Sequence, residues 1–546
     1  MGIQMNRDNY WLRRQSASVS RRNFLAAGGA VGVGLVAVAA VGCGGDGKSN
    51  GGSATPGGQP TTAAAPKRGG ELIMARATNL AFTDPQRSSG GTDPGFNRLY
   101  AETLLHREGG KIVPYIAQAY EQPDLGTITI KLRPDVKFGD GTPLNATAVQ
   151  FSIERGKDEK LAARDRAAML LVERVEAPDE FTAVLKLTRP NGLFLDAFTT
   201  ANILVSPTAV NKLGVDGFNR QPVAAGPYTV NQIVQDGDTV FLKNPAWPIK
   251  APNGDALPYF DKITNKIIPQ SEARTAALIS GEVDLVTIDL ASVKQLKSTP
   301  NVTAIESPSA SYQILEFITN KAPTNSVALR KAINYAINRE ELNQQLAFGL
   351  GKPAVESLSG DSWVADPSLP FYAYDAAKAQ EFLAQAGYPN GIELKMATYT
   401  PAQAEAIQAQ LAKAKIKTII DNLELAVYQD RFRAKAEYPM GTAGSGTESG
   451  EMYQYFLQRY GSAGRFSPGR PQNKDWDAEI TKLETMATQE ERKKQYQAMI
   501  RLSYEQAYRA FTISTPVFFG VANKVRGVVP LEGNGTNADL RLAWKA

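Results

Sequence analysis

The sequence predicts a mixed α/β protein with more than one domain. Its 546 residues exceed the usual size of a single domain and allow large buried cores. Segments with the two-residue period of a strand alternate along the chain with segments of helical period, and no internal repeat is visible. This mixture argues against an all-helical bundle or a β-sandwich. Hydrophobic residues make up 43% and charged residues 21% of the chain, the balance of a soluble globular protein.

Residues 1–42 have the pattern of an export signal. Arginines precede an uncharged run of 18 residues, 24–41, as a basic region precedes the apolar region of a signal peptide. The sequence SRRNFL around Arg21 and Arg22 matches the twin-arginine export motif. We therefore expect a protein that is exported from the cytoplasm.

The apolar run ends in the letters AVGC, which resemble a bacterial lipobox. Cys43 is the only cysteine of the chain, so lipidation explains it better than packing, and an internal disulfide is excluded. We expect a lipid anchor on Cys43 that holds the protein in the periplasm or on the outer face of the cell membrane. The alternative is an uncleaved anchor, because 18 apolar residues are at the lower limit for crossing a bilayer.

The segment that follows, residues 43–68, predicts a flexible tether. Gly, Ser, Thr, Pro and Ala dominate it, and it has no apolar periodicity. Because residues 1–42 hold five arginines against one aspartate, the rest of the chain is close to neutral. A neutral body offers no electrostatic surface for nucleic acid, so we expect no nucleic-acid partner.

Strands are predicted early in the body. The segment ELIMAR, residues 71–76, is typical of a strand. Residues 127–132, TITIKL, alternate apolar with polar side chains, which indicates a half-buried strand. Turn residues follow at 139–141, and Asn145 then caps a helix.

Helices are predicted in the second half of the chain. Apolar residues between 329 and 337 lie on one helical face, and Asn338 with Glu341 three positions later indicates a new capped helix. Residues 375–386 form an amphipathic pattern that ends at a glycine. The spacing of the apolar residues between 496 and 504 predicts a long helix near the C-terminus.

Most catalytic arrangements are excluded by residue counts. His106 is the only histidine, so a Ser-His-Asp site depends on it, and we interpret it as an ordinary surface or hinge residue. The single cysteine is predicted to be acylated. Sequence motifs for a nucleophile elbow, a zinc protease and a phosphate loop are missing, and neither a cofactor nor a metal is expected. A pair of carboxylates acting as a hydrolase is the one enzymatic alternative left.

The stretch 441–450, GTAGSGTESG, has two interpretations. A phosphate-binding loop is excluded because no lysine follows and the glycine spacing is wrong. The stretch is either a flexible loop or a backbone that approaches a ligand closely.

Six blocks of the sequence form an ordered series. The longest block is LRPDVKFGDGTPLNATAVQFSIER, residues 132–155. The others are AGPY at 225–228, KNPAW at 243–247, SGEVD at 280–284, RKAINYAINR at 330–339 and AGYP at 386–389. Together they resemble the peptide/nickel family of extracytoplasmic solute-binding proteins, over about residues 69–530.

This resemblance implies an α/β, two-lobed periplasmic-binding-protein-like fold of the type II, cluster C kind, with an extra subdomain inserted in the first lobe. The lobes close on a solute by hinge motion, and an ABC importer permease receives it. The implied division is a signal peptide at 1–42, a tether at 43–68, lobe I at 69–105, 206–310 and 512–546, the insertion at 106–205, and lobe II at 311–511.

The resemblance also implies ligand-binding residues. The family's G-W-x-x-D stretch corresponds to residues 444–448, where Glu448 replaces the aspartate that holds a peptide ammonium. Ser445 stands in place of tryptophan, next to Gly446, and removes an aromatic wall. Ile318 departs from the family's F-N-T. The remaining candidates for pocket residues are Tyr312, Phe317, Thr319 and Trp247.

The ligand itself is left open between several classes. A short peptide is the first expectation, and an oligosaccharide or opine-like solute is the second. A nickel complex is disfavoured by the single histidine, which lies far from these blocks. We expect a monomer that is not an enzyme, with a tethered hydrolase as the alternative of a different class.

Overall fold

The computed structural model describes the greater part of the chain after residue 64. The described residues are 65–77, 82–87, 96–108, 111–201, 203–234, 237–354, 363–365, 368, 370–446, 451–464, 466–467, 474–531 and 538–546, without the side chains of 308–310, 445, 446 and 474. Contacts divide the chain into Met1–Pro66 and Lys67–Ala546, and every element below belongs to the second unit.

Four predicted functional residues lie outside the described residues. They are Arg21 and Arg22 of the export motif, Cys43 of the lipobox, and Glu448. In the part of the chain that is described, no helix combines the length and hydrophobicity needed to span a bilayer.

A mixed sheet of 11 strands organises the described residues. Its strand order is β15-β14-β16-β12-β17-β11-β1-β10-β9-β8, and β13 pairs with β17 at the side. The bounds are β1 Glu71–Arg76, β8 Tyr228–Ile233, β9 Thr239–Lys243, β10 Lys262–Ile267, β11 Leu285–Ile288, β12 Val302–Phe317, β13 Lys352–Pro353, β14 Ile392–Thr398, β15 Ile416–Asn422, β16 Met440–Gly446 and β17 Arg509–Ala522.

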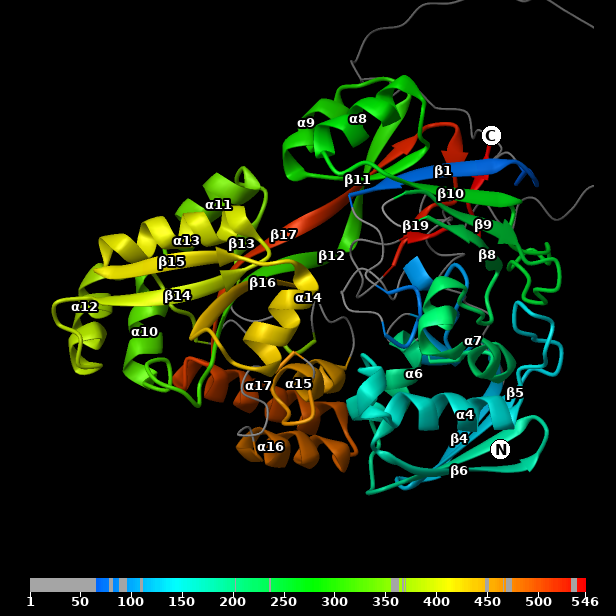
Figure 1. Cartoon of the computed structure of the whole chain (residues 1–546), viewed down its shortest axis with the longest axis horizontal. Helices are drawn as coiled ribbons and strands as arrows, with labels where there is room; N and C mark the ends of the chain where they lie inside the picture. The colour runs from blue at the N-terminus through cyan, green and yellow to red at the C-terminus, as the bar shows by residue number, and fades with distance from the viewer. Residues whose placement is uncertain are drawn as a thin grey trace, which may run out of the picture. The chain divides into compact units, whose positions relative to one another are not determined.

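Two long strands, β12 and β17, connect the two parts of this sheet (Figure 1). They have 16 and 14 residues and pair with each other in antiparallel fashion from Val302–Ala522 to Glu316–Arg509. β17 pairs with β11 near its C-terminal end, whereas β12 pairs with β16 near its own. The register shifts twice within this pair, between Glu306 and Ala310 and between Tyr312 and Ile314. Bulges of this kind let long strands bend between two packed bodies.

Helices cover both parts of the sheet. α8 Ser271–Ser280 and α9 Leu290–Lys297 pack near β11 and β17. The second part of the sheet contains β14, β15 and β16. A separate apolar core lies between this part and the helices α10 Val327–Ala336, α11 Arg339–Ala347, α12 Ala376–Gln385 and α13 Pro401–Lys413. The opposite face of that part carries α14 Leu425–Tyr428, η3 Gln429–Ala434, α15 Tyr453–Arg459, α16 Lys474–Glu484 and α17 Gln489–Glu505.

A second, antiparallel sheet of four strands has the order β4-β5-β7-β6. Its strands are β4 Ala117–Asp124, β5 Thr127–Leu132, β6 Val172–Asp179 and β7 Thr182–Leu187. The helical elements nearby in sequence are α4 Ala146–Lys157, η1 Glu159–Leu161, α5 Arg166–Met169, η2 Phe194–Asp196, α6 Ala197–Thr200 and α7 Pro207–Arg220. Three short pairs complete the described strands: β2 Leu105–Glu108 with β3 Lys111–Pro114, β18 Val525–Arg526 with β21 Trp544–Lys545, and β19 Val529–Pro530 with β20 Ala538–Asp539.

The local predictions are confirmed where the chain carries a strong signal. The strands expected at 71–76 and 127–132 are β1 and β5. Asn145 accepts a hydrogen bond from the amide of Ala148 at the start of α4, and Asn338 caps α11 in the same way. The helices expected at 375–386 and around 496–504 are α12 and α17. The predicted domain junctions at 310/311 and 511/512 fall inside β12 and β17, and the division itself stays a prediction.

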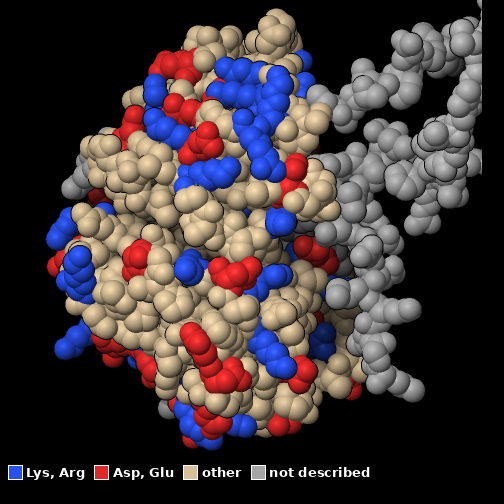
Figure 2. Space-filling view, turned by 90° about the vertical axis from the view of Figure 1, so that its right-hand side faces the viewer, with Lys and Arg blue, Asp and Glu red and all other residues tan. Residues whose placement is uncertain are grey.

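Acidic and basic side chains are mixed over the face drawn in Figure 2, with the densest basic group near its upper edge. Many of the described lysines have carboxylate partners. The carboxylate of Asp284, for example, lies 3.0 Å from the ammonium of Lys524 and 2.9 Å from that of Lys545. Such mixing is what a nearly neutral body predicts.

Candidate functional site

Beyond the end of β14, strand β16 has a backbone edge with which no other described strand pairs. β14 ends at Thr398, opposite Thr442, whereas β16 runs on to Gly446 along β12. The amide of Gly444 points away from β12, because it donates a hydrogen bond of 3.0 Å to the hydroxyl of Tyr399. A Cβ placed on Gly444 would meet no atom within 4 Å. Backbone groups of Gly444 and Gly446 therefore face the same edge, where β14 no longer covers them.

A buried ion pair lies next to the start of strand β16. Glu316 on β12 pairs in register with Gly441, and its carboxylate accepts bonds of 2.9 and 2.7 Å from Nε and Nη2 of Arg433. Tyr428 donates to the same carboxylate at 3.3 Å. Burial lowers the pKa of Arg433 when taken alone, but the Glu316 carboxylate raises it above its ordinary value. Burial and Glu316 together raise the pKa of Tyr428 well above its usual range. This buried, hydrogen-bonded pair therefore lies against the start of β16.

The close approach of Tyr428 explains a glycine of the predicted ligand-binding stretch. A Cβ on Gly441 would lie 2.8 Å from the Tyr428 hydroxyl and 3.1 Å from the carbonyl oxygen of Ala397. Gly441 therefore allows the strand to pack against the ion pair, while Gly444 leaves space on a face of the strand.

The structure brings some of the predicted ligand residues together. Tyr312 pairs in register with Ser445, and Ser311 pairs with Gly446. Tyr312 and Trp247 are buried in the same apolar cluster. Within the described residues, the indole Nε1 of Trp247 is buried without a hydrogen-bond partner.

Two predicted residues lie elsewhere. Phe317 points to the opposite face of β12 and packs into the core beneath α10 to α13. Thr319 follows the end of β12 and is half-buried. Neither residue contributes to the edge of β16 described above.

His106 was interpreted as a surface or hinge residue, and the surface interpretation is wrong. Its side chain is buried, and its Nε2 lies 3.1 Å from the carboxylate of Glu102. The ring stacks on Tyr115 with centroids 3.7 Å apart, and Arg541 lies 3.3 Å from the other oxygen of Glu102. Burial, with help from Arg98, lowers the pKa of His106 to about 4 against the opposing effect of Glu102. Burial opposes ionisation of Glu102, but Arg541 and His106 lower its pKa to about 2. At neutral pH the histidine is therefore uncharged, and its Nε2–H donates a hydrogen bond to the Glu102 carboxylate.

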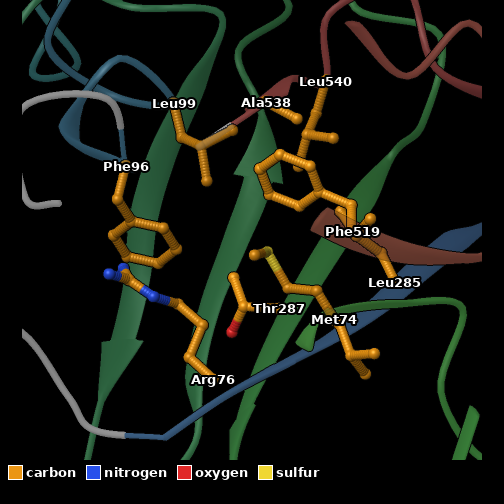
Figure 3. A pocket seen from close by; sticks show the side chains of 10 residues that line it. Met74, Arg76, Phe96, Leu99, Leu285, Thr287, Phe519, Ala538 and Leu540 are labelled. Atoms are coloured by element: carbon orange, nitrogen blue, oxygen red, sulfur yellow. The ribbon is translucent and has the colours of Figure 1, made fainter. Parts of the chain in front are cut away.

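A crevice lies at the C-terminal ends of β1 and β11, under the segment 538–540 (Figure 3). It contains about 360 Å³ of space, open solvent included. The guanidinium of Arg76 stands 4.5 Å from the centre of the Phe96 ring at this crevice. The other side chains that line it are mainly apolar: Met74, Leu99, Leu285, Val286, Thr287, Phe519, Ala538 and Leu540. Crevices at the carboxyl ends of parallel strands are frequent ligand sites in α/β proteins.

Comparison with known proteins decides the family. A model of the bacterial extracellular solute-binding proteins, family 5 Middle, matches residues 111–467, which is more than half of the chain. The chain belongs to this family. The relationship confirms the resemblance inferred from the six sequence blocks, and it places the protein among extracytoplasmic binding proteins.

The curated relatives of this chain include glutathione-binding proteins. The glutathione-binding protein GsiB of Pectobacterium atrosepticum is 29% identical over 365 residues, 65% of this chain and 69% of its own length. GsiB of Shigella flexneri is 26% identical over 366 residues, 65% of this chain and 70% of its own length. These relatives are named as solute-binding proteins and not as enzymes.

Solved structures confirm the predicted fold class. The ABC transporter-associated periplasmic binding protein DppA from Helicobacter pylori, in complex with the peptide STSA, is 25% identical, with a TM-score of 0.79 over 88% of this chain and 98% of its own. AgaA from A. tumefacien R10, in complex with agropinic acid, gives a TM-score of 0.80 at 22% identity, over 87% of this chain and 99% of its own. The two-lobed α/β fold of family 5 and the solute-binding role are thus shown for this chain.

Proposed function

We propose that this protein captures a short peptide, or a solute that closely resembles one, between its two lobes and delivers it to an ABC importer permease. The observation that carries the proposal is the backbone edge of β16 beyond the end of β14. An extended peptide adds to such an edge through main-chain hydrogen bonds, which give affinity without reading side chains.

The contacts at this edge suit a peptide. The carbonyl of Gly444 and the backbone of Gly446 face the edge and would pair with the peptide main chain. Tyr312 on β12 pairs in register with Ser445 beside this edge. The DppA structure cited above holds a four-residue peptide, and the GsiB relatives are named for glutathione, itself a short peptide.

Within this proposal, Glu448 binds the ammonium group of the peptide. It follows Gly446 by two residues, at the position where the family carries its acidic residue. A charge pair that is removed from water is worth more than one at the surface, so the ammonium would orient the peptide. Ser445 leaves room for a wider first residue than the usual tryptophan would.

We also propose a cellular location and an oligomeric state for the protein. Arg21 and Arg22 direct export by the twin-arginine route, and a lipid on Cys43 anchors the mature protein through the tether. The protein acts as a monomer that binds and releases its solute without turnover. The double variant Arg21→Lys, Arg22→Lys should stay in the cytoplasm and unprocessed, and its normal processing at Cys43 would exclude the twin-arginine route.

The ligand assignment is tested by calorimetric titration of the full chain with the peptide Ser-Thr-Ser-Ala and its N-acetylated form. The unaltered protein should bind the free peptide at least tenfold more tightly. Glu448→Ala should remove that difference, while the matched control Glu405→Ala, an exposed carboxylate on α13, should preserve it. Equal binding of both peptides by the unaltered protein would show that the ammonium is not recognised.

A further inference from the structure

A hydrogen-bonded ionic bridge joins two distant segments of the chain. One is the loop 188–193 between β7 and η2, in the predicted inserted subdomain. The other is formed by α15 and α16, which lie between β16 and β17 in the predicted second lobe. In Figure 1 the orange helices α15 to α17 lie beside the cyan segment, in a different part of the molecule from the crossing strands β12 and β17.

Glu484, the last residue of α16, is the centre of this bridge. Its carboxylate is buried and accepts bonds of 2.5 and 2.7 Å from Nε and Nη2 of Arg189, which is 295 residues away in sequence. The hydroxyl of Tyr453 donates to the same carboxylate at 2.6 Å. Asn191 then donates to the Tyr453 hydroxyl at 2.8 Å. The geometry is the two-pronged pairing that gives strong charge-assisted hydrogen bonds.

Backbone contacts and apolar packing surround the bridge. The amide of Gly192 donates to the carbonyl of Glu484 at 2.7 Å. Leu193 from the loop and Phe194 from η2 belong to the same apolar cluster as Trp476 and Leu483 of α16. Asn191, Tyr453 and Glu484 of the bridge are therefore buried, whereas Arg189 is partly exposed.

The bridge exists only when the two segments meet. If the lobes separate, water replaces Arg189 and Asn191 at Glu484 and Tyr453, and the bonds across the contact are lost. The Arg189 side chain is 40% exposed, so it can leave the contact without unfolding either segment. An interaction that forms in only one of two conformational states shifts the equilibrium toward that state by the net free energy of the interaction.

We propose that Arg189, Asn191, Tyr453 and Glu484 form a closure latch that holds the lobes together and determines the solute affinity without touching the solute. The inference rests on the two-lobed binding role of the protein. Closure that is favoured before binding raises the population able to retain solute, and the apparent affinity rises in proportion.

The test measures the separation of the lobes without any solute. Spin labels are placed at the exposed positions Lys131→Cys and Lys395→Cys in the full chain carrying Cys43→Ser, and pulsed dipolar spectroscopy gives the distance distribution. The unaltered latch should show a short-distance population. Arg189→Gln should reduce the ratio of short to long distances about tenfold, because it leaves the buried carboxylate of Glu484 without its ionic partner.

Two further variants separate the latch from general stability. Glu484→Gln should lower the same ratio, and the double variant should lower it no further than the stronger single variant. Glu437→Gln is the matched control, because it breaks the 2.7 Å pair with Arg431 inside one lobe and should leave the distances unchanged. Melting curves show that each variant is folded.

An unchanged distribution in Arg189→Gln, or a protein with the latch intact that shows only long distances, would overturn the proposal. Because no solute is added, an error in the peptide assignment leaves this result untouched. Conversely, failure of the peptide to bind a protein that closes normally would count against the peptide alone.

Discussion

The buried pair of His106 and Glu102 predicts a specific loss of stability in acid. His106 is uncharged in the folded protein, because burial lowers its pKa from 6.5 to about 4. In the unfolded chain the same ring takes up a proton below about pH 6.5. Between these two values the unfolded state binds more protons than the folded state, so acid favours unfolding.

The size of the effect follows from the two pKa values. At about 1.36 kcal/mol for each pH unit, the interval from 6.5 to about 4 corresponds to roughly 3 kcal/mol of unfolding free energy. This contribution is complete above pH 6.5 and is lost as the pH falls through about 4. Glu102, with its pKa of about 2, begins to add a loss of the same sign only below its ordinary value near 4.5.

Urea unfolding at pH 7, 6, 5 and 4.5 measures this difference, with His106→Gln as the comparison. Glutamine can still donate a hydrogen bond to Glu102 but does not titrate. The unaltered protein should lose about 2 to 3 kcal/mol more than the variant over this range, by the same conversion. Parallel pH profiles for the two proteins would refute the account of His106 as a buried, neutral donor.

Two predictions concern the support of β16 and the cap of α4. Gly441→Ala places a methyl group 2.8 Å from the hydroxyl of Tyr428 and should lower the unfolding free energy by about 1–3 kcal/mol, whereas Gly444→Ala, with open space around it, should leave stability unchanged. Equal urea midpoints for the two variants would contradict the close packing at Gly441. Asn145→Ala removes the acceptor for the amide of Ala148 and should cost about 1 kcal/mol in the same urea assay, and no measurable loss would show that the cap does not hold α4.

The parts of the fold that were predicted correctly depend on local signals. A cap such as Asn145 or Asn338 acts within three residues, and a half-buried strand such as β5 shows its two faces in six letters. The family blocks indicated the fold class, but they did not indicate the structural role of their individual residues. Arg330 and Arg339, the ends of one block, are buried and bind backbone carbonyl oxygens, among them those of Gln506 and Phe511.

The site was predicted less completely because its partners are far apart in sequence. Glu316 and Arg433 are 117 residues apart, and neither has a pattern that indicates the other. The sequence around His106 mixes polar and apolar residues without a regular period, so it did not indicate that His106 is buried. The residues that support β16 became visible only through the pairing of β16 with β12.

Binding of a short free peptide is the central claim, and a thermal-shift screen of the full chain tests it most directly. Short free peptides, N-acetylated peptides and oligosaccharides are offered separately. A ligand at about a hundred times its dissociation constant stabilises the folded state by roughly 2.7 kcal/mol, which gives a clear rise in melting temperature. The account predicts that rise with free peptides. A rise with oligosaccharides alone, or with none of the three, would contradict it.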